Sequence, residues 1–177
     1  MTYFSEGFTK DKLTVMYALT RLAVEPTKEQ MTTFFGEHGL MGYFELQSAV
    51  YELEEGGFLA AVPRPYGQAY CLTPKGRETL EMFQARLPAS LRERLGDCAD
   101  AYRDALRKQT QFSAVVERAS AQTRRVTLRA MELNGELMRV DLLLPDDASA
   151  RYACAVWPDR AQAIYAAILK ELTGPQS

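Results

Sequence analysis

The side chains that most often carry chemistry are few in this chain and lie far apart. His38 is the only histidine, and no cysteine, aspartate or second histidine stands at metal-ligand spacing from it. Three glycines surround it, Gly36, Gly39 and Gly42, but their three-residue spacing matches neither a dinucleotide loop nor a phosphate-binding loop. We therefore interpret His38 as a solvated loop residue and the glycines as turn residues.

Carboxylates gather most densely at Glu52, Glu54 and Glu55. Magnesium and calcium sites usually draw their ligands from a turn or from several elements, so we interpret this cluster as the solvated face of a helix. The sequence also has no G-x-S-x-G motif, no second histidine to pair with a cysteine and no phosphate loop. It therefore predicts a protein that is not an enzyme and that needs neither a metal nor a cofactor.

The three cysteines are odd in number, far apart in sequence and without CxxC spacing: Cys71, Cys98 and Cys154. This pattern argues against a disulfide framework or a zinc site. Buried, reduced thiols are the expected state of such cysteines, and a redox switch has no support.

The composition limits the size of the hydrophobic core and indicates the cellular compartment of the protein. With 177 residues, of which 47% are hydrophobic and 25% charged, the chain can bury one substantial core or two small ones. A formal charge of -2 gives no overall attraction to nucleic acid or to membranes. The sequence shows no signal peptide and no apolar run approaching ~20 residues, which favours a cytoplasmic protein without a membrane partner.

Elements with clear boundaries fill the first half of the chain. Residues 43–55 place apolar side chains at the spacing of one helix face and end at two glycines, where a positive φ is wanted. Two short apolar runs follow, separated by Arg64-Pro65-Tyr66-Gly67, which predicts a β-hairpin. Thr73 then caps a helix that has Pro74 at its first position. The first helix face consists of Leu46, Ala49, Val50 and Leu53, and the glycines after it are Gly56 and Gly57.

Two further helices precede these elements. The first begins at Asp11 and ends before Glu25-Pro26. The second begins near Lys28, because Thr27 and Gln30 form a capping box there. Helices followed by a hairpin and a capped helix have the order of a winged helix-turn-helix domain, which we assign to residues 1–87.

A long helix is expected over residues 88–111, as a linking or dimerisation helix. Its apolar positions alternate at spacings of four and three, which is a coiled-coil seam diluted by alanine and glutamine. The seam packs either on the winged domain of the same chain or on a second copy in a dimer. It consists of Leu91, Leu95, Cys98, Tyr102, Ala105, Gln109 and Phe112.

Residues 112–177 change to the alternating pattern of strands and predict a C-terminal domain with a small antiparallel sheet backed by one helix. Strands are expected over residues 113–119, 125–133, 137–144 and 151–157, with Asn134-Gly135 as a type I′ turn. A helix beginning at Pro158-Asp159 carries an apolar stripe that is expected to cover the sheet. That stripe consists of Ala161, Ile164, Tyr165, Ile168, Leu169 and Leu172. The fold class is therefore α+β.

The chain resembles a bacterial family of winged-helix proteins through the stretch YFELQSAVYELEEGGFL followed by AYCLTPKGRETLEMFQARLPASLRERL. That family is described as a domain of unknown function, and its members are often labelled transcriptional regulators. The element Thr73-Pro74-Lys75-Gly76 is also similar to that of PadR-type and MarR-type regulators. The resemblance begins near Leu13 and implies a cytoplasmic, dimeric, DNA-binding regulator with a C-terminal dimerisation or sensing domain.

Charge is distributed unevenly along the chain. Residues 1–60 hold four basic and nine acidic side chains, residues 61–110 hold nine and six, and residues 111–177 hold eight of each. The outer side of the helix at residues 43–55 is acidic, which opposes tight binding to phosphates. We therefore expect any phosphate-attracting surface around the hairpin and the helices just after it.

Two functions remain open. In the first, the protein is a homodimeric transcriptional regulator that binds double-stranded DNA and is a candidate for binding a small-molecule effector. In the second, it binds no DNA, and its acidic helix face binds a basic protein partner or another subunit. Side chains expected to read bases are Gln47, Ser48 and Tyr51; those expected to contact the DNA backbone are Lys28, Arg64, Tyr66, Lys75 and Arg77; the acidic face holds Glu45, Glu52, Glu54 and Glu55.

Overall fold

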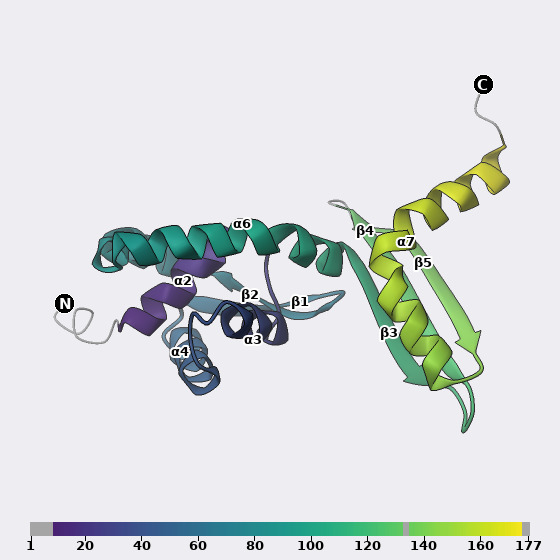
Figure 1. Ribbon diagram of the computed structural model, residues 1–177, viewed down its shortest axis with the longest axis horizontal. Coiled ribbons are helices and arrows are strands. Elements are labelled where there is room, and N and C mark those ends of the chain that lie inside the picture. Colours follow the sequence, from purple (N-terminus) through teal and green to yellow (C-terminus); the bar gives the residue numbers. More distant parts are fainter. Residues whose placement is uncertain (1–8, 133–134, 175–177) are drawn as a thin grey trace. The chain divides into compact units, whose positions relative to one another are not determined.

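The computed structural model describes residues 9–132 and 135–174 and has an α+β architecture. The described part contains six α-helices and five strands, and the strands form two small antiparallel sheets (Figure 1). The chain divides into two compact units at Arg107/Lys108, here called unit 1 and unit 2. Each unit has its own hydrophobic core and is described by itself.

Unit 1 follows the order of elements that the sequence predicts. Three helices come first, then a hairpin, a capped helix and the long helix. Their bounds are α2 (Lys10–Leu22), α3 (Lys28–Glu37), α4 (Tyr43–Glu55), β1 (Leu59–Arg64), β2 (Gly67–Leu72), α5 (Pro74–Phe83), a 3-10 turn (Gln84–Arg86) and α6 (Ala89–Gln111). The last residues of α6 belong to unit 2.

Both predicted helix caps in unit 1 are confirmed. The Thr27 hydroxyl accepts from the Gln30 N–H at 3.2 Å while the Gln30 side chain accepts from the Thr27 N–H at 2.9 Å, which completes the capping box. The Thr73 hydroxyl accepts from the Gly76 N–H at 3.0 Å at the start of α5. Local sequence alone therefore fixes where α3 and α5 begin.

The hairpin pairs β1 with β2 from Leu59↔Leu72 to Arg64↔Gly67, which leaves a two-residue turn. Gly67 has a φ of 127°, a conformation that favours glycine. The segment between α2 and α3 joins this sheet, because Thr27 forms an isolated antiparallel bridge with Ala69. The Tyr70 N–H also donates to the Pro26 carbonyl at 2.8 Å. The start of α3 is thereby fastened to the hairpin.

The core of unit 1 is formed by the faces that the sequence predicts. Leu46, Ala49, Val50 and Leu53 of α4 are buried, as are Met31, Phe34 and Phe35 of α3. On α6, Leu95 is fully buried, and Leu91, Cys98 and Tyr102 pack against the same core. The second half of the predicted seam differs, because Ala105 and Gln109 are exposed, whereas Ala99 and Leu106, which lie outside the seam, are buried.

Gly76 allows α5 to approach the hairpin closely. A β-carbon at this position would lie 2.2 Å from the carbonyl oxygen of Phe58, a distance that no side chain tolerates. The same carbonyl accepts from the N–H of Thr73 at 3.1 Å. The first turn of α5 is thus fixed to the chain just before β1.

Unit 2 is a three-stranded antiparallel sheet in the order β3-β4-β5, packed against one helix. Its elements are β3 (Phe112–Arg118), β4 (Arg124–Glu132), β5 (Gly135–Leu144) and α7 (Asp147–Thr173). Val126, Leu128 and Ala130 of β4 are buried toward α7, and Trp157 of α7 donates from Nε1 to the Arg129 carbonyl at 3.1 Å. The predicted turn at Asn134-Gly135 includes Asn134, which lies outside the described residues.

The prediction of a fourth strand over residues 151–157 and of a helix beginning at Pro158 is wrong. These residues lie in α7, which begins twelve residues before Asp159 and contains Pro158 in its interior. The helix begins there because the Asp146 carboxylate accepts from the Ser149 N–H at 2.7 Å, and this hydrogen bond holds the pKa of Asp146 below its ordinary value.

The face of α7 that covers the sheet also differs from the prediction. It consists of Ala150, Cys154, Trp157 and Ala161, which recur at helical spacing. Of the expected stripe, Ala161 is buried, but Ile164, Ile168, Leu169 and Leu172 remain exposed. The alternating pattern of the short run before Pro158 is equally compatible with one helix face, and this ambiguity caused the error.

Candidate functional site

The exposed side of α4 is the most distinctive surface of unit 1, and we call it the α4 surface. It presents three aromatic side chains with exposed fractions of 58% for Tyr43, 81% for Phe44 and 63% for Tyr51. The rings of Tyr43 and Phe44 contact each other edge to face, with centroids 5.4 Å apart. Exposed aromatic side chains are enriched where proteins bind partners, which makes the α4 surface a candidate site.

The carboxylates of the α4 surface are partly neutralised from within the chain. Lys12 of α2 forms an ion pair with Glu52 at 2.5 Å, and the Ser48 hydroxyl donates to Glu52 at 3.2 Å. These contacts, that of Lys12 first, lower the pKa of Glu52. Helix α4 itself contains no basic residue. The α4 surface is therefore aromatic and acidic.

Of the three predicted base-reading residues, Tyr51 is 63% exposed, whereas the other two form side-chain hydrogen bonds within the chain. The Gln47 amide donates to the Thr32 hydroxyl of α3 at 3.3 Å, and Ser48 is engaged with Glu52. All three side chains lie on α4, with Gln47 half-buried and the other two exposed. The structure therefore groups these residues on one helix.

The turn of the hairpin is held by Glu25, a residue that the sequence did not single out. Its carboxylate accepts from Nε of Arg64 at 2.7 Å, and its backbone carbonyl accepts from the Tyr66 hydroxyl at 2.8 Å. The hydrogen bond with Glu25 raises the pKa of Arg64, and burial raises the pKa of Tyr66. Lys28 is exposed at the start of α3, which the Thr27↔Ala69 bridge brings to this hairpin.

Lys75 and Arg77, in the first turn of α5, donate to backbone carbonyls of the same unit. Lys75 Nζ lies 2.7 Å from the Gly56 carbonyl at the end of α4 and 4.3 Å from the centre of the Phe58 ring. Arg77 donates to the Leu72 carbonyl at 3.0 Å. Both cations therefore already stabilise the junction between α4, the hairpin and α5.

Two arginines of α6 act on helix ends in the same way. Arg94 donates to the His38 carbonyl at the end of α3, at 2.8 Å. Arg103 donates to the carbonyls of Leu22 at 3.1 Å and Arg21 at 2.6 Å, where α2 ends. A cation at a helix C-terminus satisfies carbonyls that have no partner within the helix and complements the helix dipole. Much of the positive charge in residues 61–110 is thus used inside unit 1.

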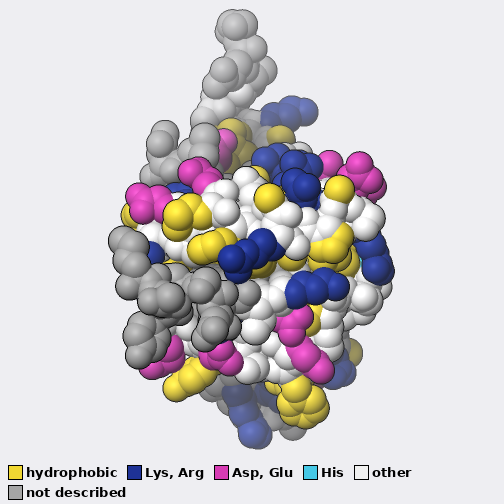
Figure 2. Space-filling view, turned by 90° about the vertical axis from the view of Figure 1, so that its left-hand side faces the viewer, with side chains coloured by type: hydrophobic (Ala, Val, Ile, Leu, Met, Phe, Trp, Pro, Cys, Tyr) yellow, Lys and Arg dark blue, Asp and Glu magenta, His cyan; other side chains and the backbone are white. Residues whose placement is uncertain are grey.

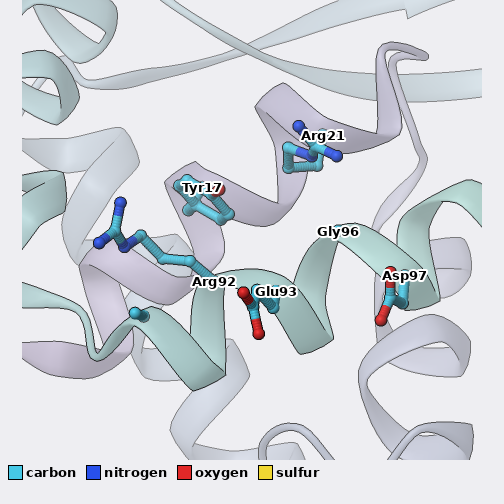
Figure 3. A pocket seen from close by; sticks show the side chains of 7 residues that line it. Tyr17, Arg21, Arg92, Glu93, Gly96 and Asp97 are labelled. Carbon is cyan, nitrogen blue, oxygen red and sulfur yellow. The ribbon is translucent and has the colours of Figure 1, made fainter.

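One face of the molecule and one of its hollows mix side chains of both charges. On the face shown in Figure 2, Lys and Arg side chains are interspersed with Asp and Glu side chains over the described part. A hollow of about 580 Å³ lies between α2 and the start of α6 (Figure 3). Its charged side chains are Arg21, Arg92, Glu93 and Asp97. Two cations and two carboxylates give this hollow no preference for an anion or a cation.

His38 differs from the expectation of a solvated residue. It ends α3, is half-buried, and its Nδ1 lies 2.8 Å from the Phe34 carbonyl. Its ring packs beside Phe34 and Tyr102. The role of His38 is therefore to close the end of α3 against α6.

Cysteines and acidic residues form no metal-binding cluster in the described part of the chain. Cys71, Cys98 and Cys154 are free and half-buried. Within residues 9–132 and 135–174, no three side chains of His, Cys, Asp or Glu converge as a metal site would require. The helices in those same ranges include none with the length and apolar character needed to span a bilayer.

Comparison with known proteins identifies one family. Residues 11–172, from the start of α2 almost to the end of α7, match the model of a family described as "Domain of unknown function (DUF4364)". No curated protein and no solved structure matches the chain. The match spans both units, so the two belong together in the architecture of that family.

Proposed function

The chain belongs to the DUF4364 family, and we propose that it is a winged-helix, DNA-binding transcriptional regulator that acts as a homodimer. The observation that carries this proposal is the arrangement of unit 1. Three helices precede a two-stranded hairpin, and the segment between α2 and α3 adds a third short strand through the Thr27↔Ala69 bridge. A winged helix has these parts. The proposal includes a similarity of unit 1 to PadR-type and MarR-type regulators.

In this proposal α4 is the recognition helix and the β1–β2 hairpin is the wing. Such a helix enters the major groove, and side chains near it reach base edges while basic side chains hold the phosphates. Tyr51, Ser48 and Gln47 are the base-reading candidates. Lys28, Arg64, Tyr66, Lys75 and Arg77 are the candidates for backbone contacts.

Among the candidates for contacts to the DNA backbone, Lys28 and Arg64 can reach DNA with the smallest loss of folding stability. Lys28 is exposed. The ion pair between Arg64 and Glu25 is also at the surface, with side chains that are 41% and 36% exposed. Surface pairs of this kind contribute only about 0–1 kcal/mol, so Arg64 can exchange the carboxylate for a phosphate. Lys75 and Arg77 would first have to leave backbone carbonyls.

Few phosphate contacts and an acidic recognition helix together predict DNA binding to which electrostatic attraction contributes little. The affinity should depend weakly on salt, because the slope of log K against log[salt] scales with the number of neutralised phosphates. Specificity would come mainly from Tyr51 and its neighbours on α4. Unit 2 would serve as the dimerisation or effector-sensing part.

A second candidate function follows from the composition of the α4 surface. Tyr43, Phe44 and Tyr51 are exposed on the same helix as the exposed carboxylates of Glu54 and Glu55. An acidic surface with large aromatic side chains is suited to a basic protein segment, because it offers both apolar area and opposite charge. In this candidate the domain is an interaction module that binds no DNA.

Fluorescence anisotropy with DNA fragments from upstream of the gene, titrated with salt, tests the first function. We expect sequence-dependent binding that Lys28→Ala combined with Arg64→Ala weakens and makes less dependent on salt. Arg125→Ala is the matched control, since Arg125 is an exposed arginine of unit 2. Equal affinity and an equal salt slope in the double variant would refute this contact model.

A reversal of charge on α4 separates the two functions. Glu54→Lys combined with Glu55→Lys should strengthen DNA binding, because it removes repulsion between α4 and phosphates. The same change should weaken the capture of a basic protein partner. Loss of partner binding in a protein that binds no DNA at low salt would support the interaction module.

A further inference from the structure

The last turns of α7 extend beyond the sheet of unit 2. Ala161 is the last fully buried residue of the helix, and the helix continues to Thr173. In Figure 1 the first part of α7 lies against the strands, whereas its C-terminal part has no strand of unit 2 beneath it. Within its own unit, this part of α7 therefore has no packing partner among the described residues.

This unsupported part of the helix nevertheless carries an apolar face, which we call the α7 stripe. Ile164, Ile168, Leu169 and Leu172 recur at helical spacing and are 38%, 37%, 41% and 79% exposed. An isolated helix of three turns is marginal in water, and helices in proteins are stabilised mainly by packing of an apolar face. The α7 stripe therefore requires a partner surface.

The charges beside the α7 stripe indicate which partner fits. Arg160 and Glu171 are eleven residues apart, which is close to three full turns, so both lie on the same flank of the stripe. Both side chains are exposed, and neither has an ion pair or hydrogen bond among the described residues. One flank of the helix thus carries a cation at its start and an anion at its end.

Such a flank is complementary to itself when two copies of the helix run antiparallel. The two-fold axis would pass between Tyr165 and Ile168. The flank that carries Arg160 and Glu171 in one copy then faces the same flank of the other copy. Arg160 of each copy therefore lies opposite Glu171 of the other. The offset along the helix is about 3 Å at a rise of 1.5 Å per residue, which these long side chains span. In a parallel pair, that flank would instead face the flank that carries Gln162 and Ala166, and it would find no charge there.

We propose that the α7 stripe is the contact between two copies of this chain, packed as an antiparallel, two-fold helix pair with reciprocal ion pairs between Arg160 and Glu171. This inference identifies the dimer interface of the proposed homodimer. Of the proposed function, it rests only on the formation of a homodimer. It does not depend on DNA binding. The two-fold interface is isologous, so one patch of residues serves both copies.

The mass of the full chain in solution, measured by light scattering over a range of concentrations, tests the inference. We expect twice the 19.9 kDa of one chain for the wild type and a single-chain mass for Ile168→Glu, which places a carboxylate at the centre of the stripe. Tyr152→Glu is the matched control, because Tyr152 is 61% exposed on the same helix but lies outside the stripe. Circular dichroism and Trp157 fluorescence confirm that each variant is folded.

Exchange of the two charges gives a sharper readout. Arg160→Glu alone or Glu171→Arg alone should raise the dissociation constant of the dimer about fivefold or more, since each creates two like-charge pairs. The double variant should restore the wild-type dissociation constant. A dimeric Ile168→Glu variant, or a double variant that is no tighter than the single ones, would overturn the proposal.

The outcomes also separate this inference from the proposed function. A wild-type protein that is a monomer at every concentration overturns the α7 contact, and DNA binding by that monomer would leave the regulator in place. A dimer that Ile168→Glu dissociates but that binds no DNA supports the α7 contact and counts against the regulator.

Discussion

Arg103 shows at the scale of one residue how the cations of unit 1 are used. Its guanidinium donates to the two carbonyl oxygens at the end of α2 and also pairs with Asp100 of its own helix at 2.7 Å. Hydrogen bonds to a charged donor contribute about 1.5–3 kcal/mol each when the acceptor would otherwise lack a partner. Arg103 is thus a structural residue, although a basic residue in this part of the sequence suggests a contact to nucleic acid.

We expect Arg103→Ala to lower the free energy of unfolding of unit 1 by about 2–3 kcal/mol, because the carbonyls of Leu22 and Arg21 lose a charged donor. Chemical denaturation followed by far-ultraviolet circular dichroism measures the change. Arg125→Ala should alter the stability by less than about 0.5 kcal/mol, as surface substitutions usually do. A similar effect of both variants would show that Arg103 contributes only its surface charge.

At the scale of elements, the closest approach in unit 1 is that of α5 to the chain before β1. Gly76→Ala should destabilise the protein by about 1–3 kcal/mol or more, because the new methyl group would overlap the Phe58 carbonyl unless α5 moves. Gly36→Ala in α3 is the control, since a β-carbon at Gly36 would meet no atom within 4 Å, and it should stabilise the helix by about 0.5–1 kcal/mol. Thermal unfolding of the two variants should therefore shift in opposite directions.

Elements with local signals could be predicted from the sequence. The capping box of Thr27 and Gln30, the Thr73-Pro74 start of α5 and the turn before Gly67 all depend on residues within four positions of each other. The fold class and the order of elements follow from them. The start of α7 has a local signal too, because Asp146 accepts from the Ser149 N–H, but the short apolar run that follows fits a strand as well as a helix.

The candidate site was less predictable, because its contacts join residues far apart in sequence. Glu25 meets Arg64, Lys12 meets Glu52, and Arg103 meets the end of α2. No local pattern distinguishes a cation that caps a distant helix from one that faces solvent. The sequence could therefore place Tyr51 and Ser48 on an outer helix face, but it could not show that Lys75 and Arg77 have partners within the chain.

At the scale of the whole molecule, the separate cores of the two units predict two unfolding events. Trp157 is the only tryptophan and lies in the core of unit 2, whereas Leu53 is fully buried in unit 1. Leu53→Ala removes a buried side chain and should destabilise unit 1 by about 2–5 kcal/mol.

Denaturation of Leu53→Ala with two probes tests this prediction. The circular dichroism signal follows the helices of both units, and most of these helices lie in unit 1. Its unit 1 transition should therefore move to a lower denaturant concentration, while the midpoint of Trp157 fluorescence should stay at the wild-type value. Equal shifts of both midpoints would mean that the two units unfold as one cooperative block.

The arginines and the lysine that close the helix ends of unit 1 also set an order for its assembly during synthesis. A chain leaves the ribosome from its N-terminus, so α2, α3 and α4 emerge before Lys75, Arg94 and Arg103, which bind their last carbonyls. Leu95 and Leu106, which complete the core, emerge late as well. The N-terminal helices of the nascent protein therefore reach their final packing only after α6 has been synthesised.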